Sequence, residues 1–301
     1  MSAQKFFTLS NGNKIPAISI IGTGTQWYKG GADSPFNKNL VEQIKFALSL
    51  PGVTHVDAAE NYRTYPELSQ ALKESTKPRD QIWITDKFSK VIHKTPKDAL
   101  NDSLKQLGID YVDLYLLHDP FYSKENPGYD VQQAWKYVEE LYKAGLAKNI
   151  GVSNFAVEDL KKILEIAEIK PVINQIEYSA FLQNQTPGIY EFAKENNILL
   201  EAYAPLGPLS NAAGEQSGEF YDLLSSLSKK YNHDKGLILL RWVYQTGVLP
   251  ITTSSKQERI ETATKVWEFE LTNDEVEKLS KLGNEHATVR QYWKPQYDQY
   301  N

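Results

Sequence analysis

The sequence predicts a single (β/α)8 barrel, and three observations indicate this fold class. Short apolar runs rich in β-branched residues alternate with amphipathic helical stretches, as expected of parallel strands joined by helices. Eight such units follow one another along 301 residues, a length that one barrel domain commonly reaches. A hairpin signal precedes the first unit. We therefore expect one domain over residues 1–301, with the N-terminal β-hairpin closing the bottom of the barrel.

The predicted strands are mostly apolar throughout, which is typical of strands buried on both faces of a parallel sheet. They cover residues 17–22, 53–57, 82–87, 112–118, 149–153, 172–177, 199–203 and 248–252. Between them, apolar residues recur at three- and four-residue spacing, for example at Ala134, Val138 and Leu141. This spacing predicts helices with one buried face. Eight such units indicate closure into a TIM barrel.

The N-terminal and C-terminal segments carry further signals. Residues 6–16 hold two short strands around Asn11-Gly12, and Asn-Gly is the strongest short-range signal of a β-hairpin. Residues 207–218 are rich in Gly, Ser, Ala and Asn and predict a loop. The tail from residue 284 is too aromatic for simple exposed coil, so we expect it to pack over another part of the molecule. Its aromatic residues are Tyr292, Trp293, Tyr297 and Tyr300.

The composition favours a small-molecule partner in a reducing compartment. There are 33 Lys and Arg against 38 Asp and Glu, a net charge of −5, whereas nucleic-acid binding needs a basic surface. The absence of cysteine excludes disulfides and Cys-ligated zinc, and we expect no metal site. No secretory signal or apolar run of about 20 residues is present. These features predict a cytoplasmic protein without an obligate protein partner.

Four ionisable residues follow three consecutive predicted strands: Asp57, Tyr62, Lys87 and His118. Alone, each has a structural interpretation, since an Asp after a strand often caps a helix and a His in an apolar strand is often a core residue. In a barrel, however, the carboxyl ends of the strands all face one mouth, where barrel enzymes place their sites. Four complementary groups at that mouth indicate one catalytic site.

Together these four side chains suit Tyr62 to act as a proton donor. The phenol of Tyr62 has an ordinary pKa of about 10, and we expect the Lys87 ammonium to lower it, a shift toward 7 taking roughly 4 kcal/mol. Asp57 is then needed to keep a buried lysine charged. A neutral His118 imidazole would hydrogen-bond the substrate oxygen. An alternative is a Schiff-base enzyme with Lys87 as nucleophile, but it leaves Asp57 and Tyr62 without a clear role.

The tetrad resembles the Asp, Tyr, Lys, His tetrad of the aldo-keto reductase superfamily, and the resemblance covers essentially the whole chain. It includes Gly22-Thr23-Gly24-Thr25, Gly151-Val152-Ser153-Asn154-Phe155, Asn174-Gln175, and Ser254 with Arg259. The local sequences at Ile21–Trp27, His118–Phe121 and Thr252–Lys256 are similar to those of the fungal α-keto amide and conjugated polyketone reductases. The resemblance implies an NADPH-dependent carbonyl reductase acting on a ketone or aldehyde, such as an α-keto amide, keto ester, diketone or ketolactone, with Tyr62 as general acid.

The resemblance also implies the cofactor site. Ser153, Asn154 and Gln175 would hold the nicotinamide carboxamide, Tyr203 would stack on its ring, and Ser254 and Arg259 match the family's 2′-phosphate ligands. Many relatives have Lys where this chain has Thr253, so that contact is either replaced by Lys256 or lost. The full expected set is Gly24, Thr25, Ser153, Asn154, Gln175, Tyr203, Ala204, Pro205, Leu206, Gly207, Leu209, Thr253, Ser254, Ser255, Lys256 and Arg259.

The expected substrate pocket departs from many relatives. Asp119 stands where they have an aromatic residue after the catalytic His, and Ser89 where they have Trp after the Lys. We expect replacement walls from Trp27, Tyr28, Asp119, Phe121 and Trp293, and an ionised Asp119 would disfavour anionic 2-keto acids. A second function, a non-catalytic regulatory subunit that binds nucleotide, stays open because fold does not fix function.

Overall fold

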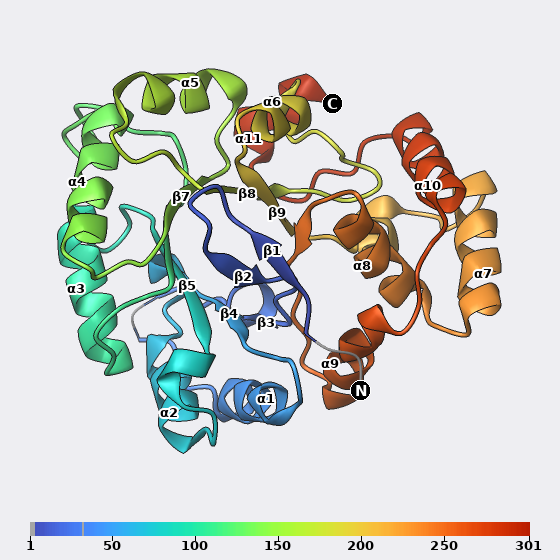
Figure 1. Cartoon of the computed structure of the whole chain (residues 1–301), viewed down its shortest axis with the longest axis horizontal. Helices are drawn as coiled ribbons and strands as arrows, with labels where there is room; N and C mark the ends of the chain where they lie inside the picture. Colours follow the sequence, from blue (N-terminus) through green and yellow to red (C-terminus); the bar gives the residue numbers. More distant parts are fainter. Residues whose placement is uncertain (1–3, 32) are drawn as a thin grey trace.

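Eight parallel strands form one sheet that closes on itself (Figure 1). The computed structural model describes residues 4–31 and 33–301. The closure is made between Ser19 and Ile251, which form a parallel bridge, and the Gly22 amide donates to the Thr252 carbonyl at 3.2 Å. Every predicted strand range overlaps one observed strand, and only β5 extends past its predicted end, by one residue, which confirms the (β/α)8 fold. The strands are β3 (Ile21–Gly22), β4 (His55–Asp57), β5 (Trp83–Phe88), β6 (Leu114–Leu117), β7 (Ile150–Ser153), β8 (Ile173–Glu177), β9 (Leu199–Tyr203) and β10 (Leu249–Pro250).

Helices surround this sheet and complete the crossovers between its strands (Figure 1). Three of them, α7, α10 and α11, are additional to the repeating β–α pattern, since α7 precedes the crossover helix α8 and the other two follow α9. The helices are α1 (Lys38–Ser49), α2 (Tyr65–Glu74), α3 (Pro96–Leu107), α4 (Val131–Lys143), α5 (Val157–Ile166), α6 (Ile189–Glu195), α7 (Glu219–Tyr231), α8 (Lys235–Gln245), α9 (Gln257–Thr264), α10 (Asn273–Glu285) and α11 (Lys294–Tyr297).

Capping residues set where the helices begin and end. Thr95 accepts a hydrogen bond from the Asp98 amide before α3, and Pro96 occupies the first turn, where no amide hydrogen is needed. The same helix ends at Gly108, which has a φ of 68° that favours glycine. Asp130 caps α4 in the same way. These caps fix the lengths of the loops that follow β5 and β6 at the barrel mouth.

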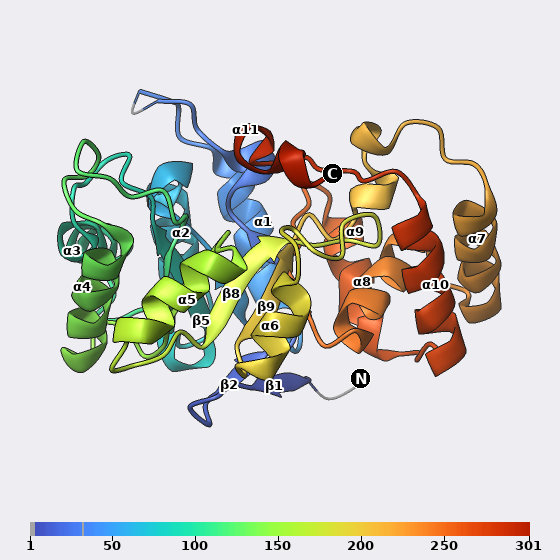
Figure 2. The ribbon, with the colours of Figure 1, turned by 90° about the horizontal axis from the view of Figure 1, so that it is seen from above.

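A hairpin plugs the barrel at the end opposite the C-terminal segment (Figure 2). It consists of β1 (Phe6–Thr8) and β2 (Lys14–Pro16), paired antiparallel. Its buried Leu9 and Ile15 belong to a cluster that contains no helix residue. The other buried residues of that cluster lie in or next to the barrel strands and are Leu114, Leu116, Val172, Ile173, Leu249 and Ile251. This cluster fills the lower barrel interior, and the prediction that the hairpin closes the bottom is confirmed.

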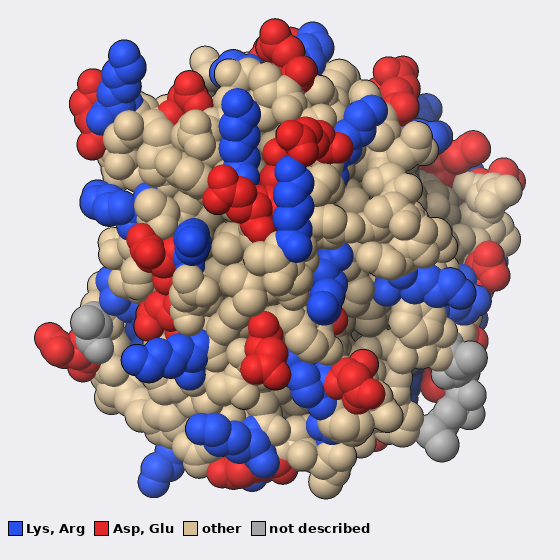
Figure 3. All heavy atoms as spheres, turned by 60° about the vertical axis from the view of Figure 1, so that its left-hand side comes forward, with Lys and Arg blue, Asp and Glu red and all other residues tan. Residues whose placement is uncertain are grey.

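One face of the outer surface carries charges of both signs. On the face shown in Figure 3, Lys and Arg alternate with Asp and Glu without forming a continuous patch of one sign. Within the described part of the chain, no helix is long and apolar enough to cross a membrane.

Candidate active site

The four residues predicted from the strand ends meet at the mouth of the barrel. Lys87 extends from β5 and places its Nζ 2.7 Å from Asp57 Oδ2 at the end of β4. The same ammonium donates to the Ala58 carbonyl at 2.8 Å and lies 3.3 Å from the Tyr62 hydroxyl. Tyr62 ends the short 3-10 helix η2 (Glu60–Tyr62). One buried cation thus bridges a carboxylate and a phenol from neighbouring segments.

Two neighbours hold η2 and the Tyr62 ring in place. A Cβ on Gly24 would lie 2.8 Å from the ring of Tyr62, so only glycine permits this approach. Glu60 is buried, and its Oε2 accepts from the Ser89 amide and hydroxyl at 2.9 and 3.0 Å, while its Oε1 accepts from the His93 amide at 2.7 Å. Ser89, where many relatives have Trp, therefore ties the loop after β5 to η2.

Burial and charge act in opposite directions on each member of this pair, and both members keep their protons. Burial acts to lower the pKa of Lys87, but the Asp57 carboxylate and Tyr62 outweigh it and raise the pKa above its ordinary value. The ammonium therefore stays charged. Burial raises the pKa of Tyr62 by more than the Lys87 charge lowers it. The expected lowering of the tyrosine pKa toward 7 is thus wrong for this arrangement, because desolvation of the phenolate dominates.

His118 follows β6 and faces the same phenol. Its ring meets the Tyr62 ring edge to face, with centroids 5.8 Å apart and an angle of 80°. Burial, and then the charges of Lys87 and Lys90, lower the pKa of His118 well below its ordinary value. The imidazole is therefore neutral at pH 7, as predicted.

A polar chain continues from Asp57 across the barrel interior. The Nε2 of Gln175, on β8, lies 2.9 Å from Asp57 Oδ1 and 2.9 Å from Glu201 Oε2, on β9. Sequence reasoning missed Glu201, although a lone carboxyl in the otherwise uncharged run Leu199–Tyr203 was a usable signal. Burial raises the pKa of Glu201 to about 8, so this carboxyl is protonated at neutral pH.

Asn154 joins the ends of four strands in a second network. Its Nδ2 donates to the His118 carbonyl at 2.9 Å and to Ser153 Oγ at 3.0 Å. Its Oδ1 accepts from the Tyr203 hydroxyl at 2.7 Å and from Gln185 Nε2 at 3.1 Å. All hydrogen-bonding capacity of the Asn154 amide nitrogen is used within the protein, so this residue has a structural role beside the predicted cofactor contact.

The aromatic C-terminal segment packs over the mouth, as the sequence suggested (Figure 2). Glu177, at the end of β8, accepts from the Gln291 amide at 2.7 Å and from the Tyr292 amide at 3.0 Å. The Tyr292 ring then meets Tyr203 edge to face at 5.6 Å. Burial raises the pKa of Glu177 to about 7. The segment is therefore anchored by a carboxyl that the sequence alone did not single out.

Asp119 is placed differently from the expectation of a free charge beside His118. It is buried, forms an ion pair with Lys90 and accepts from the Phe121 amide at 2.8 Å. Lys90 also lies 4.2 Å from the centre of the Tyr122 ring. The pair cancels most of the charge of Asp119 at the mouth.

Of the four aromatic residues predicted to line the substrate pocket, one is buried and three are not. Phe121 and Trp293 lie together, with ring centroids 5.6 Å apart, and Tyr28 is exposed. Trp27 is instead buried, and its Nε1 donates to Thr253 Oγ1 at 3.1 Å. Trp27 and Thr253 therefore link the loops after β3 and β10.

The segment after β9 follows a strained path. Ala204 has a φ of 53°, which lies in the left-handed region that residues other than glycine rarely adopt. The chain then forms the 3-10 helix η4 (Gly207–Leu209). A Cβ on Gly207 would lie 2.8 Å from Ser179 Oγ, so a larger residue there would have to displace the Ser179 side chain. Pro205 and Leu206 lie between these two constrained positions.

The predicted phosphate ligands stand at the start of α9. Ser254 Oγ accepts from the Lys256 amide at 3.0 Å, and Lys256 precedes the first residue of the helix without capping it through its side chain. Lys256, Arg259 and Ser255 are exposed. Within residues 4–31 and 33–301, neither Lys256 nor Arg259 forms an ion pair, so both cations are available to an anion.

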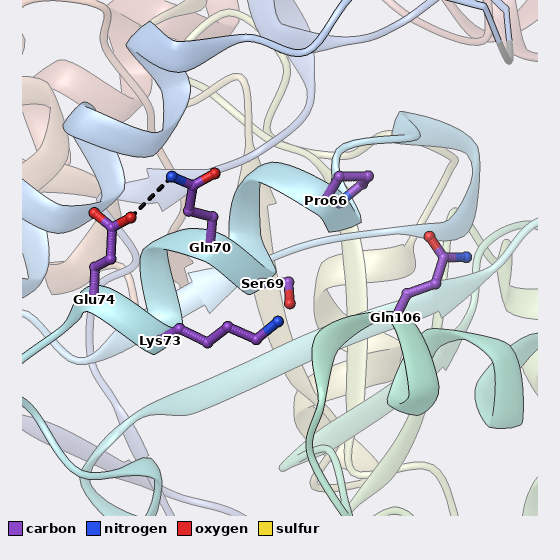
Figure 4. A pocket seen from close by; sticks show the side chains of 6 residues that line it. All are labelled: Pro66, Ser69, Gln70, Lys73, Glu74 and Gln106. Atoms are coloured by element: carbon purple, nitrogen blue, oxygen red, sulfur yellow. Dashed lines mark hydrogen bonds between the residues drawn. The ribbon is translucent and has the colours of Figure 1, made fainter.

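A groove of about 520 Å³ also lies on the outer helices (Figure 4). It runs beside α2 and reaches α3, and Gln70 in its wall donates to Glu74 at 2.8 Å. Its lining residues are Pro66, Ser69, Gln70, Lys73, Glu74 and Gln106. None of the tetrad residues lines this groove.

Comparison with known proteins identifies the family of this chain. The model of the Aldo/keto reductase family matches residues 20–284. The NADPH-dependent alpha-keto amide reductase of Saccharomyces cerevisiae is 57% identical over 99% of this chain and 97% of its own. The NAD/NADP-dependent indole-3-acetaldehyde reductase of Schizosaccharomyces pombe is 38% identical over 91% of this chain and 94% of its own. A Bombyx mori aldo-keto reductase solved with NADP superposes with a TM-score of 0.84 at 28% identity, over all of both chains.

The barrel and its mouth therefore define an oxidoreductase with an Asp, Tyr, Lys, His tetrad. The chain belongs to the aldo/keto reductase family.

Proposed function

We propose that this chain uses NADPH to reduce a ketone or aldehyde, with Tyr62 as the proton donor. The observation that carries the proposal is the buried Lys87 ammonium, which contacts both Asp57 and the Tyr62 hydroxyl. NADPH, when bound, supplies a hydride to the carbonyl carbon. The protein supplies the proton, so that hydride and proton together convert the carbonyl to an alcohol.

Each tetrad residue has a part in the proton transfer. A protonated Tyr62 gives its proton to the carbonyl oxygen as that oxygen gains negative charge. Lys87 stabilises the phenolate that remains, and Asp57 keeps Lys87 charged. Neutral His118 donates a hydrogen bond to the same oxygen and orients it. A non-catalytic regulatory role would give this buried ion pair no function. A Schiff base on Lys87 would require the amine to lose its proton, which the ion pair with Asp57 opposes.

The residues present fit the cofactor. Gln175 has an oxygen that accepts no hydrogen bond from the described residues, beside Ser153, and Tyr203 offers a ring. The segment 204–209 and the cations Lys256 and Arg259 would hold the pyrophosphate and the 2′-phosphate. Arg259→Ala is expected to weaken NADPH binding about 10- to 150-fold, the value of one charged hydrogen bond, and NADH binding far less. Fluorescence titration checks this; equal losses for both cofactors would assign Arg259 to loop structure.

The proposed substrates are neutral α-dicarbonyl compounds, α-keto amides above all. The yeast relative named for that activity supports this class, and Phe121 with Trp293 offers an apolar wall for a bulky flanking group. The expected compartment is the cytoplasm, on the basis of the cysteine-free sequence.

The deciding experiment follows NADPH absorbance at 340 nm with a panel of α-keto amides, keto esters and diketones. Wild type is expected to consume NADPH, and Tyr62→Phe to lose about 10²- to 10⁴-fold in kcat while it still binds NADPH. Binding of NADPH by wild type without turnover of any panel member would favour the regulatory alternative. A covalent adduct trapped by borohydride would favour the Schiff base.

A further inference from the structure

Glu201 is a fully buried carboxyl group beside the proposed nicotinamide site. In the parallel register it stands opposite Gln175, and its Oε2 accepts from Gln175 Nε2 at 2.9 Å. Its other oxygen has no hydrogen-bond partner within the described residues, and no cation among them pairs with it. The tetrad chemistry does not use this group.

The two carboxyls on either side fix the orientation of the Gln175 amide. Asp57 forms an ion pair with Lys87, so its Oδ1 only accepts hydrogen bonds. The Gln175 atom 2.9 Å away must then be the nitrogen, and its two hydrogens are both used, one on Asp57 and one on Glu201. The amide oxygen therefore points away from both carboxyls.

Asp57 alone would not fix this oxygen equally well. A single acceptor satisfies one N–H of a primary amide and leaves the second N–H to compete for other partners. A second acceptor on the adjacent strand gives the other N–H a partner as well. Turning the amide over would lose both hydrogen bonds and place its oxygen against the Asp57 carboxylate.

We propose that Glu201 is a positioning residue for the cofactor, which acts through Gln175. It turns the Gln175 oxygen to accept a hydrogen bond from the carboxamide nitrogen of the nicotinamide. This inference rests on the proposed contact between Gln175 and that carboxamide.

The environment of Glu201 determines which substitutions are informative. Burial raises its pKa to about 8, so Glu201 acts as an uncharged acceptor at neutral pH. Glu201→Gln retains a neutral acceptor oxygen at the same distance along the side chain. Glu201→Met has a similar length and no comparable acceptor.

The test compares two ligands by calorimetry. NADP⁺ carries the carboxamide, whereas 2′-phospho-ADP-ribose lacks the nicotinamide and probes the rest of the site. Glu201→Met is expected to weaken NADP⁺ binding about 5- to 10-fold, the value of one neutral hydrogen bond. Its affinity for 2′-phospho-ADP-ribose should stay within about twofold of wild type, and Glu201→Gln should keep both affinities within about twofold.

Three results would overturn the inference: unchanged NADP⁺ binding by Glu201→Met, equal losses for both ligands, or a loss in Glu201→Gln as large as in Glu201→Met. If Glu201→Met does not fold, Glu201→Val removes the acceptor with less volume and carries the same comparison. Gln175→Met separates this inference from the proposed function. Unchanged NADP⁺ affinity in Gln175→Met would contradict the carboxamide contact itself, whereas a loss there without one in Glu201→Met would contradict only the role of Glu201.

Discussion

The lower and upper halves of the barrel interior are built on the same strands but use opposite chemistry. On β8, Ile173 lies in the apolar cluster below, and Gln175, two residues on, joins the polar chain above. On β9, Leu199 packs against that cluster and Glu201 joins the chain. Residues two apart on a strand share one face. On each of these strands, a residue that packs in the lower interior is therefore followed two positions later by a residue of the polar network at the mouth.

The two halves also differ in what they contribute to stability. Buried apolar groups in the lower half stabilise the fold by about 25 cal/mol per Å² removed from water. The upper half removes charged and ionisable groups from water, and such pairs are often no more stable than an apolar replacement. Burial in the lower half, which the hairpin closes, therefore stabilises the barrel, whereas the polar groups at the mouth are explained by the proposed function.

The largest expected effect is that of Lys87→Met in the upper half. Asp57 would be left buried with Gln175 but without its cation, which costs about 3–5 kcal/mol. Loss of the charge that stabilises the phenolate should also lower kcat about 10²- to 10⁴-fold. Denaturant unfolding and NADPH oxidation measure the two losses, and near-normal turnover would remove Lys87 from the mechanism.

The matched change in the lower half is Ile173→Ala. The side chain is fully buried, so its truncation should cost about 2–5 kcal/mol in unfolding free energy. Because no catalytic group touches this cluster, the protein that remains folded should keep its kcat at 25 °C. A fall in kcat comparable with that of Lys87→Met would show that the two halves are not separable.

The third prediction concerns the pH dependence of stability through Glu201. Its folded pKa of about 8 lies above its ordinary value of 4.5, so the folded state holds this proton more tightly than the unfolded chain. That contribution is fully present below about pH 4.5 and is lost as pH rises through about 8. Glu201→Gln does not titrate, so its stability relative to wild type should increase over that range, by at most about 1.4 kcal/mol per pH unit.

Thermal melts of both proteins from pH 5 to 8 measure this difference. The exposed Glu215→Gln serves as the control, and its melting temperature should follow that of wild type at every pH. A constant offset between Glu201→Gln and wild type would indicate that Glu201 is already ionised in the fold.

The smallest expected effect belongs to the Lys90–Asp119 pair. Because the two charges cancel, the double variant Lys90→Met/Asp119→Asn should change the ratio of kcat/KM for a 2-keto acid over its ester by less than about threefold. Lys90→Met alone should shift the ratio against the acid. A large change in the double variant would mean that Asp119 acts on the substrate as a free charge.

The order of the elements was predictable because it depends on local patterns. The apolar runs at 172–177 and 199–203 contain β8 and β9, and the Asn-Gly pair lies in the turn of the observed hairpin. Parallel strands with their carboxyl ends at one mouth then bring Asp57, Lys87 and His118 together. For the same reason the tetrad was visible in the sequence, since three members stand at strand ends and Tyr62 lies on the loop after the first of those strands.

Only the tertiary structure decided which polar groups pair across the mouth. Gln175 meets Asp57 across 118 residues of chain, and Glu177 meets the Gln291 amide across 114. Lys90 neutralises Asp119, and burial reverses the expected direction of the Tyr62 pKa. Periodicity determines which face of a strand a residue occupies, whereas its partners and its desolvation depend on how the barrel closes and which loops cover it.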